Sequence, residues 1–301
     1  MYNGVINIYK ERGYTSADVV AKLRGIFHQK KIGHTGTLDP EAEGVLPVCL
    51  GNATKLVERL TDKRKEYVCT MRLGVETDTE DMTGQVLRES PVDVSEEEVS
   101  AAIESFVGEY LQVPPMYSAL KQGGKRLYEL AREGVSVERP PRRVEIFSVD
   151  ISSVTLPLAV FSVSCSRGTY IRSLCRDIGE KLGCGAAMEK LLRSKSGEFT
   201  LDTARRLSEV EELAGKGEAD SAIIGIEHFY EELPAYTVRA GYGKLLDNGN
   251  PLGTFAFEEE PETSGECRIY DENGAFRAVY AWDAGKGHFM PVTMYGSTEQ
   301  T

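Results

Sequence analysis

The chain has 301 residues, of which 41% are hydrophobic and 27% are charged, and its formal net charge is −12. This apolar fraction supports a folded core and excludes disordered, collagen-like and low-complexity classes, while the length predicts about two domains. No segment is long and apolar enough for a membrane span, and the first residues lack the apolar run of a signal peptide. We therefore expect a cytoplasmic protein without a membrane partner.

The acidic excess belongs to the last third of the chain. Residues 1–206 carry 29 Lys and Arg against 29 Asp and Glu, whereas residues 207–301 carry six against 18. Residues 117–143 are locally basic, with seven Lys and Arg against three Glu. The negative total therefore does not exclude a polyanionic partner for the first two thirds.

The first predicted elements are a strand and a helix. Residues 4–9 contain the closely spaced apolar side chains of a short strand. Ser16 is the expected N-cap of the helix, with Asp18 in its first turn. Apolar residues then follow at helical spacing as far as Phe27.

A loop-rich segment and a clear strand come next. Residues 31–52 are punctuated by glycine and proline, with a short apolar strand at 45–50. Residues 67–73 alternate between apolar and more polar side chains, which is typical of a strand with one buried face.

The middle of the chain mixes helices and strands. Ser95 and Glu98 form a capping box that opens a helix, and a second short helix is expected at 127–132. Two strands are expected at 144–151 and 158–165.

The last part of the chain changes from helices to short strands. An amphipathic helix begins near residue 171 and ends at Gly183, and residues 208–229 are acidic and helical. Residues 236–295 contain short strands separated by turns rich in glycine and asparagine. This order predicts an α+β fold followed by a small all-β domain.

One aspartate lies in a loop crowded with glycine and proline. The segment from Gly33 to Pro47 contains Asp39 and leads into the apolar strand at 45–50. The simpler interpretation is a tight turn in which the carboxylate binds nearby backbone. The alternative is a nucleophile or general base held in a rigid loop. A phosphate-binding loop is disfavoured because both glycine-rich phosphate motifs are absent.

Two arginines one helical turn apart follow the strand at 158–165. Arg172 and Arg176 share a face near the start of the predicted helix. A helix N-terminus is the positive end of the helix dipole, so a cation there favours a carboxylate or phosphate partner. Tyr170 precedes them as either a core aromatic or the wall of a pocket.

Two charged segments flank the strand at 67–73. Residues 63–67 place basic side chains before an aromatic one. Such a charge run is usually a solvated face, and the alternative is a stacking ring beside phosphate contacts to RNA. Residues 77–84 are acidic but do not follow the EF-hand pattern. The six cysteines form no C-x-x-C pair, and the histidines form no H-E-x-x-H motif. We therefore expect reduced structural cysteines and no metal.

Five motifs follow one another along the chain. The first is Gly33-His34-Thr35-Gly36-Thr37-Leu38-Asp39-Pro40, with its glycine-rich continuation to Lys55. The others are the tyrosine strand from Tyr67, the acidic loop at 77–84, the segment at 112–121, and Arg167-Gly168-Thr169-Tyr170-Ile171-Arg172. In this order they resemble the TruB family of tRNA pseudouridine synthases. Residues 191–199 resemble a further family element, in which Leu192 and Ser194 replace an arginine and a threonine.

The resemblance implies both a fold and an activity. The fold is a catalytic domain at 1–232, with a mixed, largely antiparallel sheet flanked by helices and a basic insertion at about 90–143. A PUA-like all-β domain follows at 236–295. The activity is isomerisation of the uridine at position 55, in the T-loop of tRNA, to pseudouridine. That reaction breaks the N1–C1′ bond and rejoins the base through C5, without redox change, metal or cofactor.

The resemblance also implies roles for particular residues. Asp39 is the catalytic aspartate, acting either by attack at C1′ or through a glycal-like intermediate, and Arg172 is the cation that keeps it ionised. Tyr67 stacks on the flipped uracil and assists removal of the C5 proton. Tyr170 and Leu191 line the pocket. His34 packs beside the flipped nucleotide or fills its gap, and Asp81 contacts the base or orders Arg172.

A folded T-loop must release the target uridine, at a cost of a few kcal/mol that phosphate contacts offset. Residues 63–65 and 117–143 supply the candidate basic side chains, of which the best are Lys63, Arg64, Lys121, Arg126, Arg142 and Arg143.

Two alternatives remain open at this point. One is the archaeal and eukaryal branch of the family, which is directed to its RNA by a guide RNA and should lack the basic insertion. The other is a non-catalytic chaperone that folds tRNA and keeps a vestigial site. We expect a monomer that binds the T-arm without a guide RNA.

Overall fold

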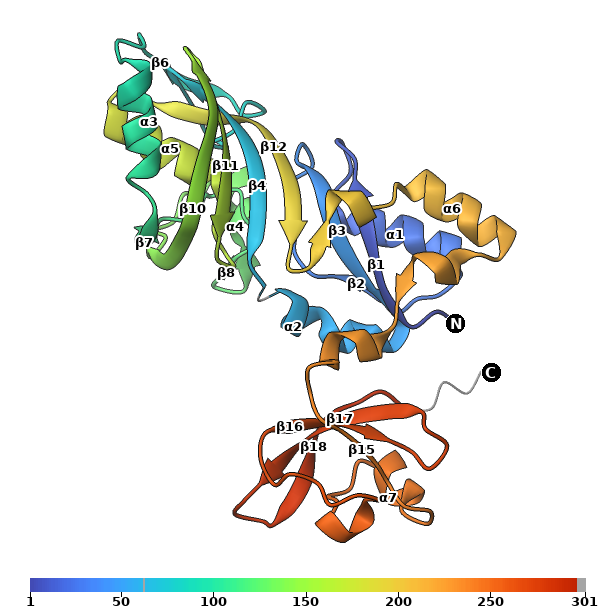
Figure 1. The fold of residues 1–301 in the computed structure, drawn as a ribbon. Coiled ribbons are helices and arrows are strands. Elements are labelled where there is room, and N and C mark those ends of the chain that lie inside the picture. The colour runs from blue at the N-terminus through green and yellow to red at the C-terminus, as the bar shows by residue number, and fades with distance from the viewer. Residues whose placement is uncertain (62, 297–301) are drawn as a thin grey trace.

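The computed structural model describes residues 1–61 and 63–296. The chain forms one long sheet with helices on it, and a separate small sheet made by its C-terminal part (Figure 1). This confirms the predicted α+β class with a small C-terminal sheet domain. Each helix within the described ranges is too short or too polar to cross a membrane.

The large sheet has ten strands, and all but one of its pairings are antiparallel. Along the sheet the strands are β14 (Ile223–Ile224), β1 (Gly4–Lys10), β3 (Glu43–Leu50), β12 (Ala186–Ser196), β4 (Lys65–Leu73), β11 (Leu158–Cys165), β10 (Arg142–Thr155) and β7 (Gly108–Gln112). The short strands β2 (Ile32–His34) and β13 (Phe199–Thr200) pair with β3 and β12.

The two halves of this sheet meet where β3 and β12 run parallel. Leu192 pairs with Glu43, and Arg193 pairs with Gly44. Gly44 has φ +104°, and a Cβ atom there would lie 2.2 Å from the carbonyl oxygen of Arg193. Only glycine permits this approach, so Gly44 allows the two halves to join.

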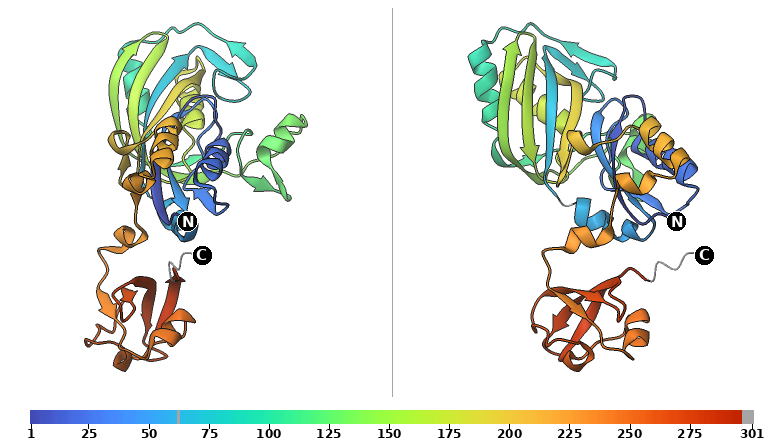
Figure 2. Two further views of the ribbon diagram at one scale, coloured as in Figure 1. Left: turned by 90° about the vertical axis from the view of Figure 1, so that its right-hand side faces the viewer. Right: turned by 45° about the vertical axis from the view of Figure 1, so that its right-hand side comes forward.

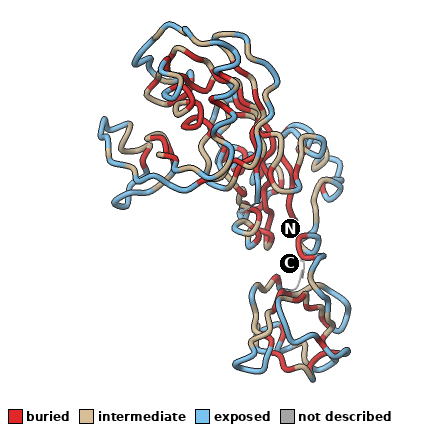
Figure 3. The backbone as a smooth tube through the Cα atoms, turned by 60° about the vertical axis from the view of Figure 1, so that its left-hand side comes forward, coloured by how far each residue is buried: buried red, intermediate tan, exposed pale blue. Residues whose placement is uncertain are grey.

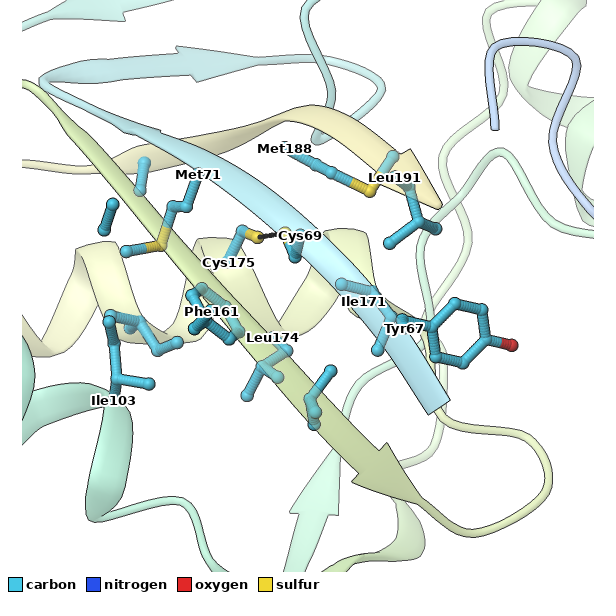
Figure 4. Close-up of a cluster of buried hydrophobic side chains, with 14 of the residues drawn as sticks. Tyr67, Cys69, Met71, Ile103, Phe161, Ile171, Leu174, Cys175, Met188 and Leu191 are labelled. Atoms are coloured by element: carbon cyan, nitrogen blue, oxygen red, sulfur yellow. Dashed lines mark hydrogen bonds between the residues drawn. The ribbon is translucent and has the colours of Figure 1, made fainter. Parts of the chain in front are cut away.

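Two pairs of helices cover the two halves of the sheet (Figure 1). The helices α1 (Ser16–Phe27) and α6 (Leu207–Lys216) share a core with β1 and β3. The helices α3 (Glu96–Glu104) and α5 (Ile171–Leu182) share another core with β4, β11 and β12 (Figure 4). Strand β11 has the bounds predicted from the sequence, and the predicted capping box precedes α3.

The cap of α1 differs from the sequence prediction. The N-cap is Thr15, whose hydroxyl accepts a hydrogen bond from the Asp18 amide at 3.0 Å, while the Asp18 carboxylate accepts one from the Thr15 amide at 2.8 Å. Ser16 is buried and its hydroxyl is used elsewhere, by Leu38. The prediction was wrong by one residue because both side chains can cap a helix.

A small arm projects from the body of the protein (Figure 2, left). It consists of the hairpin β8 (Lys121–Gln122) and β9 (Lys125–Arg126) followed by α4 (Leu127–Arg132). Most of its residues are exposed (Figure 3). A second hairpin, β5 (Val75–Thr77) and β6 (Val86–Glu89), extends from the end of β4.

The C-terminal sheet has its own core and also packs on the large domain. Its strands are β15 (Ala235–Thr237), β16 (Glu266–Tyr270), β17 (Phe276–Asp283) and β18 (His288–Met294), accompanied by the short helix α7 (Gly243–Asp247). Val279 and Tyr295 belong to a buried cluster with residues of β1, β3 and α2 (Val57–Thr61). The hydroxyls of Tyr230 and Tyr295 are 2.6 Å apart across this junction.

Candidate active site

The loop between β2 and β3 holds Asp39 in a fixed backbone conformation. The Leu38 amide donates to the Ser16 hydroxyl at 2.9 Å, and this hydroxyl donates to the Leu38 carbonyl at 3.3 Å. On the other side, the Pro40 carbonyl accepts from the Gly13 amide at 2.9 Å. The residue that was expected to cap α1 therefore anchors the loop on which Asp39 lies.

Lys10 is a further anchor that the sequence reasoning missed. Its side chain is fully buried, and its ammonium donates to the carbonyls of Pro40 at 3.0 Å, Tyr14 at 2.6 Å and Glu11 at 3.1 Å. Burial lowers the pKa of Lys10 to about 8. The sequence indicated this anchoring role only by the position of Lys10, at the end of an apolar strand.

Arg172 binds the Asp39 carboxylate through two nitrogens. Its Nε lies 2.9 Å from Oδ2 of Asp39, and its Nη2 donates to Oδ1 at 3.1 Å. The Arg172 side chain is 5% exposed, whereas that of Asp39 is 37% exposed. Desolvation by the surrounding protein raises the pKa of Asp39, and the positive charge of Arg172 opposes that shift. The carboxylate is thus held in place while one side stays open to a ligand.

The remaining donors of Arg172 are fixed by two other segments. Its Nη1 donates to the Thr79 carbonyl at 2.9 Å, and its Nη2 also donates to the Tyr117 carbonyl at 2.9 Å. Asp81 is 3.8 Å from Nη1. The other Asp81 oxygen accepts from the Thr83 amide at 3.0 Å. Asp81 therefore fixes its own loop and adds a second negative charge beside Arg172.

Tyr67 lies on β4 opposite Arg193, and Leu191 lies on β12 opposite Cys69. Tyr67 and Leu191 are buried, and Figure 4 shows the Tyr67 ring at the end of the apolar cluster, with its hydroxyl directed away from the other side chains. Desolvation raises the pKa of Tyr67, while the charge and hydrogen bond of Arg193 oppose the shift. The phenol is therefore neutral near pH 7.

Arg193 is the second functional candidate that the sequence reasoning did not select. It is 1% exposed, and it donates to the Val45 carbonyl at 2.7 Å and the Gly36 carbonyl at 3.3 Å. In the sequence, Gly36 precedes Asp39 and Val45 follows it. Strand periodicity would have placed Arg193 on the same face as Leu191 once β12 was recognised as a strand.

Tyr170 and His34 complete the set predicted around Asp39. Tyr170 precedes α5, and its backbone makes two hydrogen bonds with the Gln112 side chain. The Tyr170 amide donates to Oε1 of Gln112 at 2.8 Å, and Nε2 of Gln112 donates to the Tyr170 carbonyl at 3.0 Å. His34 ends β2, and its Nδ1 accepts from the Gly36 amide at 3.3 Å. Burial lowers the pKa of His34, so its ring is neutral near pH 7.

Within residues 1–61 and 63–296, no cluster of three or more His, Cys, Asp or Glu side chains has the geometry to hold a metal ion. All six cysteines are buried and free. The Sγ atoms of Cys69 and Cys175 lie 3.5 Å apart within the buried cluster that Figure 4 shows. The polar side chains near Asp39 instead form an acid–arginine arrangement suited to positioning one carboxylate.

Known proteins are similar in sequence to this chain over nearly its full length. The family described as "TruB family pseudouridylate synthase (N terminal domain)" matches residues 24–171. The family described as "tRNA pseudouridylate synthase B C-terminal domain" matches residues 172–227. A protein of Lachnoclostridium phytofermentans named tRNA pseudouridine synthase B is 48% identical, over 97% of this chain and 99% of its own. The chain belongs to the TruB family of pseudouridine synthases.

Other TruB relatives extend the comparison. The tRNA pseudouridine synthase B of Bacillus pumilus is 43% identical over 100% of both chains. Among solved structures, a chain of a Cbf5–Nop10–Gar1 complex matches with a TM-score of 0.70 and 26% identity, over 98% of this chain and 87% of that one. As a TruB family member the protein is an isomerase that converts uridine to pseudouridine.

The basic residues predicted to bind RNA lie on different parts of this TruB enzyme. Arg64 and Arg143 line one open depression of about 350 Å³, in which the Arg64 guanidinium stacks 3.9 Å from the centre of the Phe147 ring. Lys63 precedes Arg64 and is exposed, as is Arg142 beside Arg143. The other two candidates, Lys121 and Arg126, lie on the arm.

Lys65 differs from the prediction for residues 63–65. It is buried, and its ammonium donates to the carbonyls of Thr61 at 2.6 Å and Lys63 at 2.8 Å. The alternation of β4 turns this side chain inward, so it stabilises the turn before the strand and does not contribute to the exposed basic surface.

Proposed function

We propose that the enzyme isomerises the uridine at position 55, in the T-loop of tRNA, with Asp39 as its catalytic aspartate. The observation that carries this proposal is the Asp39 carboxylate, bound at 2.9 and 3.1 Å by a buried arginine yet 37% exposed. The relatives' name, tRNA pseudouridine synthase B, supports tRNA as the substrate.

The reaction needs an ionised carboxylate beside C1′ of the ribose. Asp39 either attacks C1′ directly or removes a ribose proton to give a glycal-like intermediate. In either route the N1–C1′ bond breaks, and its electron pair leaves with the uracil. The base then turns, and C5 bonds to C1′. In the direct route the Asp39–C1′ bond breaks at this step and the carboxylate is released; in the glycal route the ribose regains its proton from Asp39. The C5 proton is then lost while N1 gains one. Arg172 keeps Asp39 ionised against the effect of burial.

Three side chains surround the place where the flipped base would lie. Tyr67 stacks on the uracil, and Tyr170 and Leu191 line the pocket. Because the raised pKa keeps the Tyr67 phenol protonated near pH 7, we assign it stacking ahead of proton transfer. His34 is neutral and packs beside the extruded nucleotide or fills its gap, and Asp81 orders Arg172.

Extruding the uridine costs a few kcal/mol, which contacts to phosphates offset. The exposed residues Lys63, Arg64, Arg142 and Arg143 supply one group of such contacts, beside the depression of about 350 Å³. Lys121 and Arg126 supply the other on the arm. RNA loops are recognised by shape and by stacking of splayed bases, which suits basic side chains that lie beside aromatic ones, as Arg64 does beside Phe147.

The domain limits and the assembly belong to the same proposal. Residues 1–232 form the catalytic domain, with an insertion at about 90–143, and residues 236–295 form the PUA-like domain. The separate sheet of β15, β16, β17 and β18 supports this second assignment. The enzyme works as a cytoplasmic monomer without a guide RNA. The arm in the insertion favours this over a guide-dependent enzyme, whose insertion was expected to be absent.

The decisive experiment is mass mapping of pseudouridine in a T-arm hairpin after incubation with the purified protein alone. We expect one pseudouridine at the position equivalent to 55, and none with Asp39→Asn, which preserves the shape of the side chain. Product only after a guide RNA is added would favour the guide-dependent alternative. RNA binding without any product would favour the non-catalytic chaperone.

A further inference from the structure

Glu80 is a buried acid whose backbone conformation is unusual. It has φ +64°, in the left-handed region that non-glycine residues seldom occupy, and it is 9% exposed. Strain of this kind persists only where surrounding contacts impose it, and it occurs often at functional sites. Glu80 lies between Thr79, whose carbonyl binds Arg172, and Asp81.

The Glu80 side chain is bound by α5 through both oxygens. Its Oε2 accepts from the Ser173 hydroxyl at 2.6 Å, and its Oε1 pairs with the Arg176 guanidinium. The backbone on either side is bound by β12, since the Glu80 carbonyl accepts from the Met188 amide at 3.0 Å and the Met82 amide donates to the Met188 carbonyl at 3.1 Å. The loop at 77–83 is therefore held between α5 and β12.

Arg172 and Arg176 hold the same two segments one helical turn apart. Arg172 binds the Thr79 carbonyl and the Tyr117 carbonyl, both at 2.9 Å. Arg176 binds the Glu80 carboxylate and, at 3.0 Å, the Val113 carbonyl. The second arginine thus repeats the contacts of the first with the acidic loop and with the segment that leads into the arm.

We propose that Glu80 and Arg176 form a positioning pair for Arg172, holding the Thr79 carbonyl and the root of the arm so that the guanidinium meets Asp39 through two nitrogens. The side chains of the pair bind Ser173, Asp177 and the Val113 carbonyl, so the pair acts on Asp39 through Arg172. This inference rests on the proposed function, in which an ionised Asp39 performs the reaction.

The geometry separates this role from a direct electrostatic one. After desolvation, the largest influences on the pKa of Asp39 come from Arg172, Asp81 and Lys10, and Asp39 in turn raises the pKa of Tyr67 and of Tyr170. The Glu80 carboxylate is bound by Ser173 and Arg176, and its hydrogen bonds do not include Asp39. Removing its charge should therefore alter Asp39 only by releasing Arg172.

Glu80→Gln is the first test, with the rate and the pH profile measured on a T-arm hairpin. A displacement of Arg172 by about 1 Å should lower kcat by about 10- to 100-fold, with KM unchanged. The acid limb of the kcat profile should move to higher pH by about one unit, because Asp39 loses part of its cationic partner. Arg176→Met should reproduce both changes.

A matched control removes an ion pair of similar burial elsewhere. Asp271 and Arg277 in the C-terminal sheet lie 3.0 Å apart, with side chains 12% and 13% exposed. Asp271→Asn should lower the melting temperature and leave the acid limb in place. A Glu80→Gln protein that behaves like this control, with wild-type kcat per folded molecule, would overturn the positioning role.

The failure of the underlying function has a different signature. If Asp39→Asn stays fully active, or the unaltered enzyme forms no pseudouridine, the proposed function is wrong and the pair loses its role with it. If Asp39→Asn is inactive while Glu80→Gln and Arg176→Met keep the wild-type kcat and pH profile, only the positioning pair is overturned.

Discussion

Asp39 and Arg172 are 133 positions apart in the chain, yet the arginine binds both carboxylate oxygens, at 2.9 and 3.1 Å. The aspartate comes from a loop between two strands and the arginine from the first turn of α5. Arg172 also reaches two backbone carbonyls, so its position is determined by three separate segments.

Arg172→Lys should retain the charge and lose the geometry. One ammonium cannot bind two carboxylate oxygens and two carbonyls at once, so kcat should fall about 100-fold. The pKa of Asp39 should rise further, and the acid limb of the activity profile should move to higher pH. Arg72→Lys, in an ion pair with Glu189 on the same sheet, is the control and should have no effect on the profile. An unmoved acid limb in Arg172→Lys would contradict the pairing.

Lys10 should make stability depend on pH in a predictable direction. Its pKa is about 8 in the folded protein and about 10.4 in an unfolded chain, so between these values the unfolded state binds more protons. The free energy of unfolding contributed by Lys10 should therefore rise with pH across this window, by about 2 to 3 kcal/mol. Urea unfolding at several pH values should give this difference between the wild type and Lys10→Met. Parallel curves would show that the lysine is not perturbed.

Lys10→Met should also destabilise the protein at pH 7, because three buried carbonyls lose their donor. The expected loss is about 2 to 4 kcal/mol. The Pro40 carbonyl is among the three, so loosening of the Asp39 loop should lower kcat as well as stability.

Arg193 and Tyr67 should be energetically coupled. A double-mutant cycle of Arg193→Met and Tyr67→Phe should give a coupling of at least about 1 kcal/mol in the free energy of unfolding, because each change removes the same hydrogen bond. The control cycle pairs Arg193→Met with Tyr110→Phe, whose hydroxyl binds Gln112 instead. Additive effects in the first cycle would indicate that the two side chains act independently.

Charge reversal of Arg142 and Arg143 tests the RNA surface. Each lost phosphate contact should make the slope of log affinity against log salt less steep by about one, and weaken binding of a T-arm hairpin at low salt. Lys216→Glu on α6, whose side chain is 57% exposed, is the control for a change in net charge. A salt slope equal to the wild type would remove both arginines from the contact surface.

The sequence by itself determined the elements with strong local signals. The alternation of residues 67–73 became β4, and the apolar run at 158–165 became β11 with the expected bounds. The helix ending at Gly183 and the capping box before α3 also agree. These features depend on neighbours within a few positions, which a single sequence displays directly. Motif order pointed to the family for the same reason, since its residues are contiguous.

Only the tertiary structure decided which distant groups meet. Ser16 looked like a cap, and instead its hydroxyl binds the backbone of Leu38 on another loop. Lys10 binds the Pro40 carbonyl and Arg193 binds the Val45 carbonyl, both on other segments of the chain, and the charge of a side chain does not reveal which carbonyl it will bind. Contacts of this kind form when the sheet brings β3, β4 and β12 together, because packing, not local preference, selects the partner of a buried polar group.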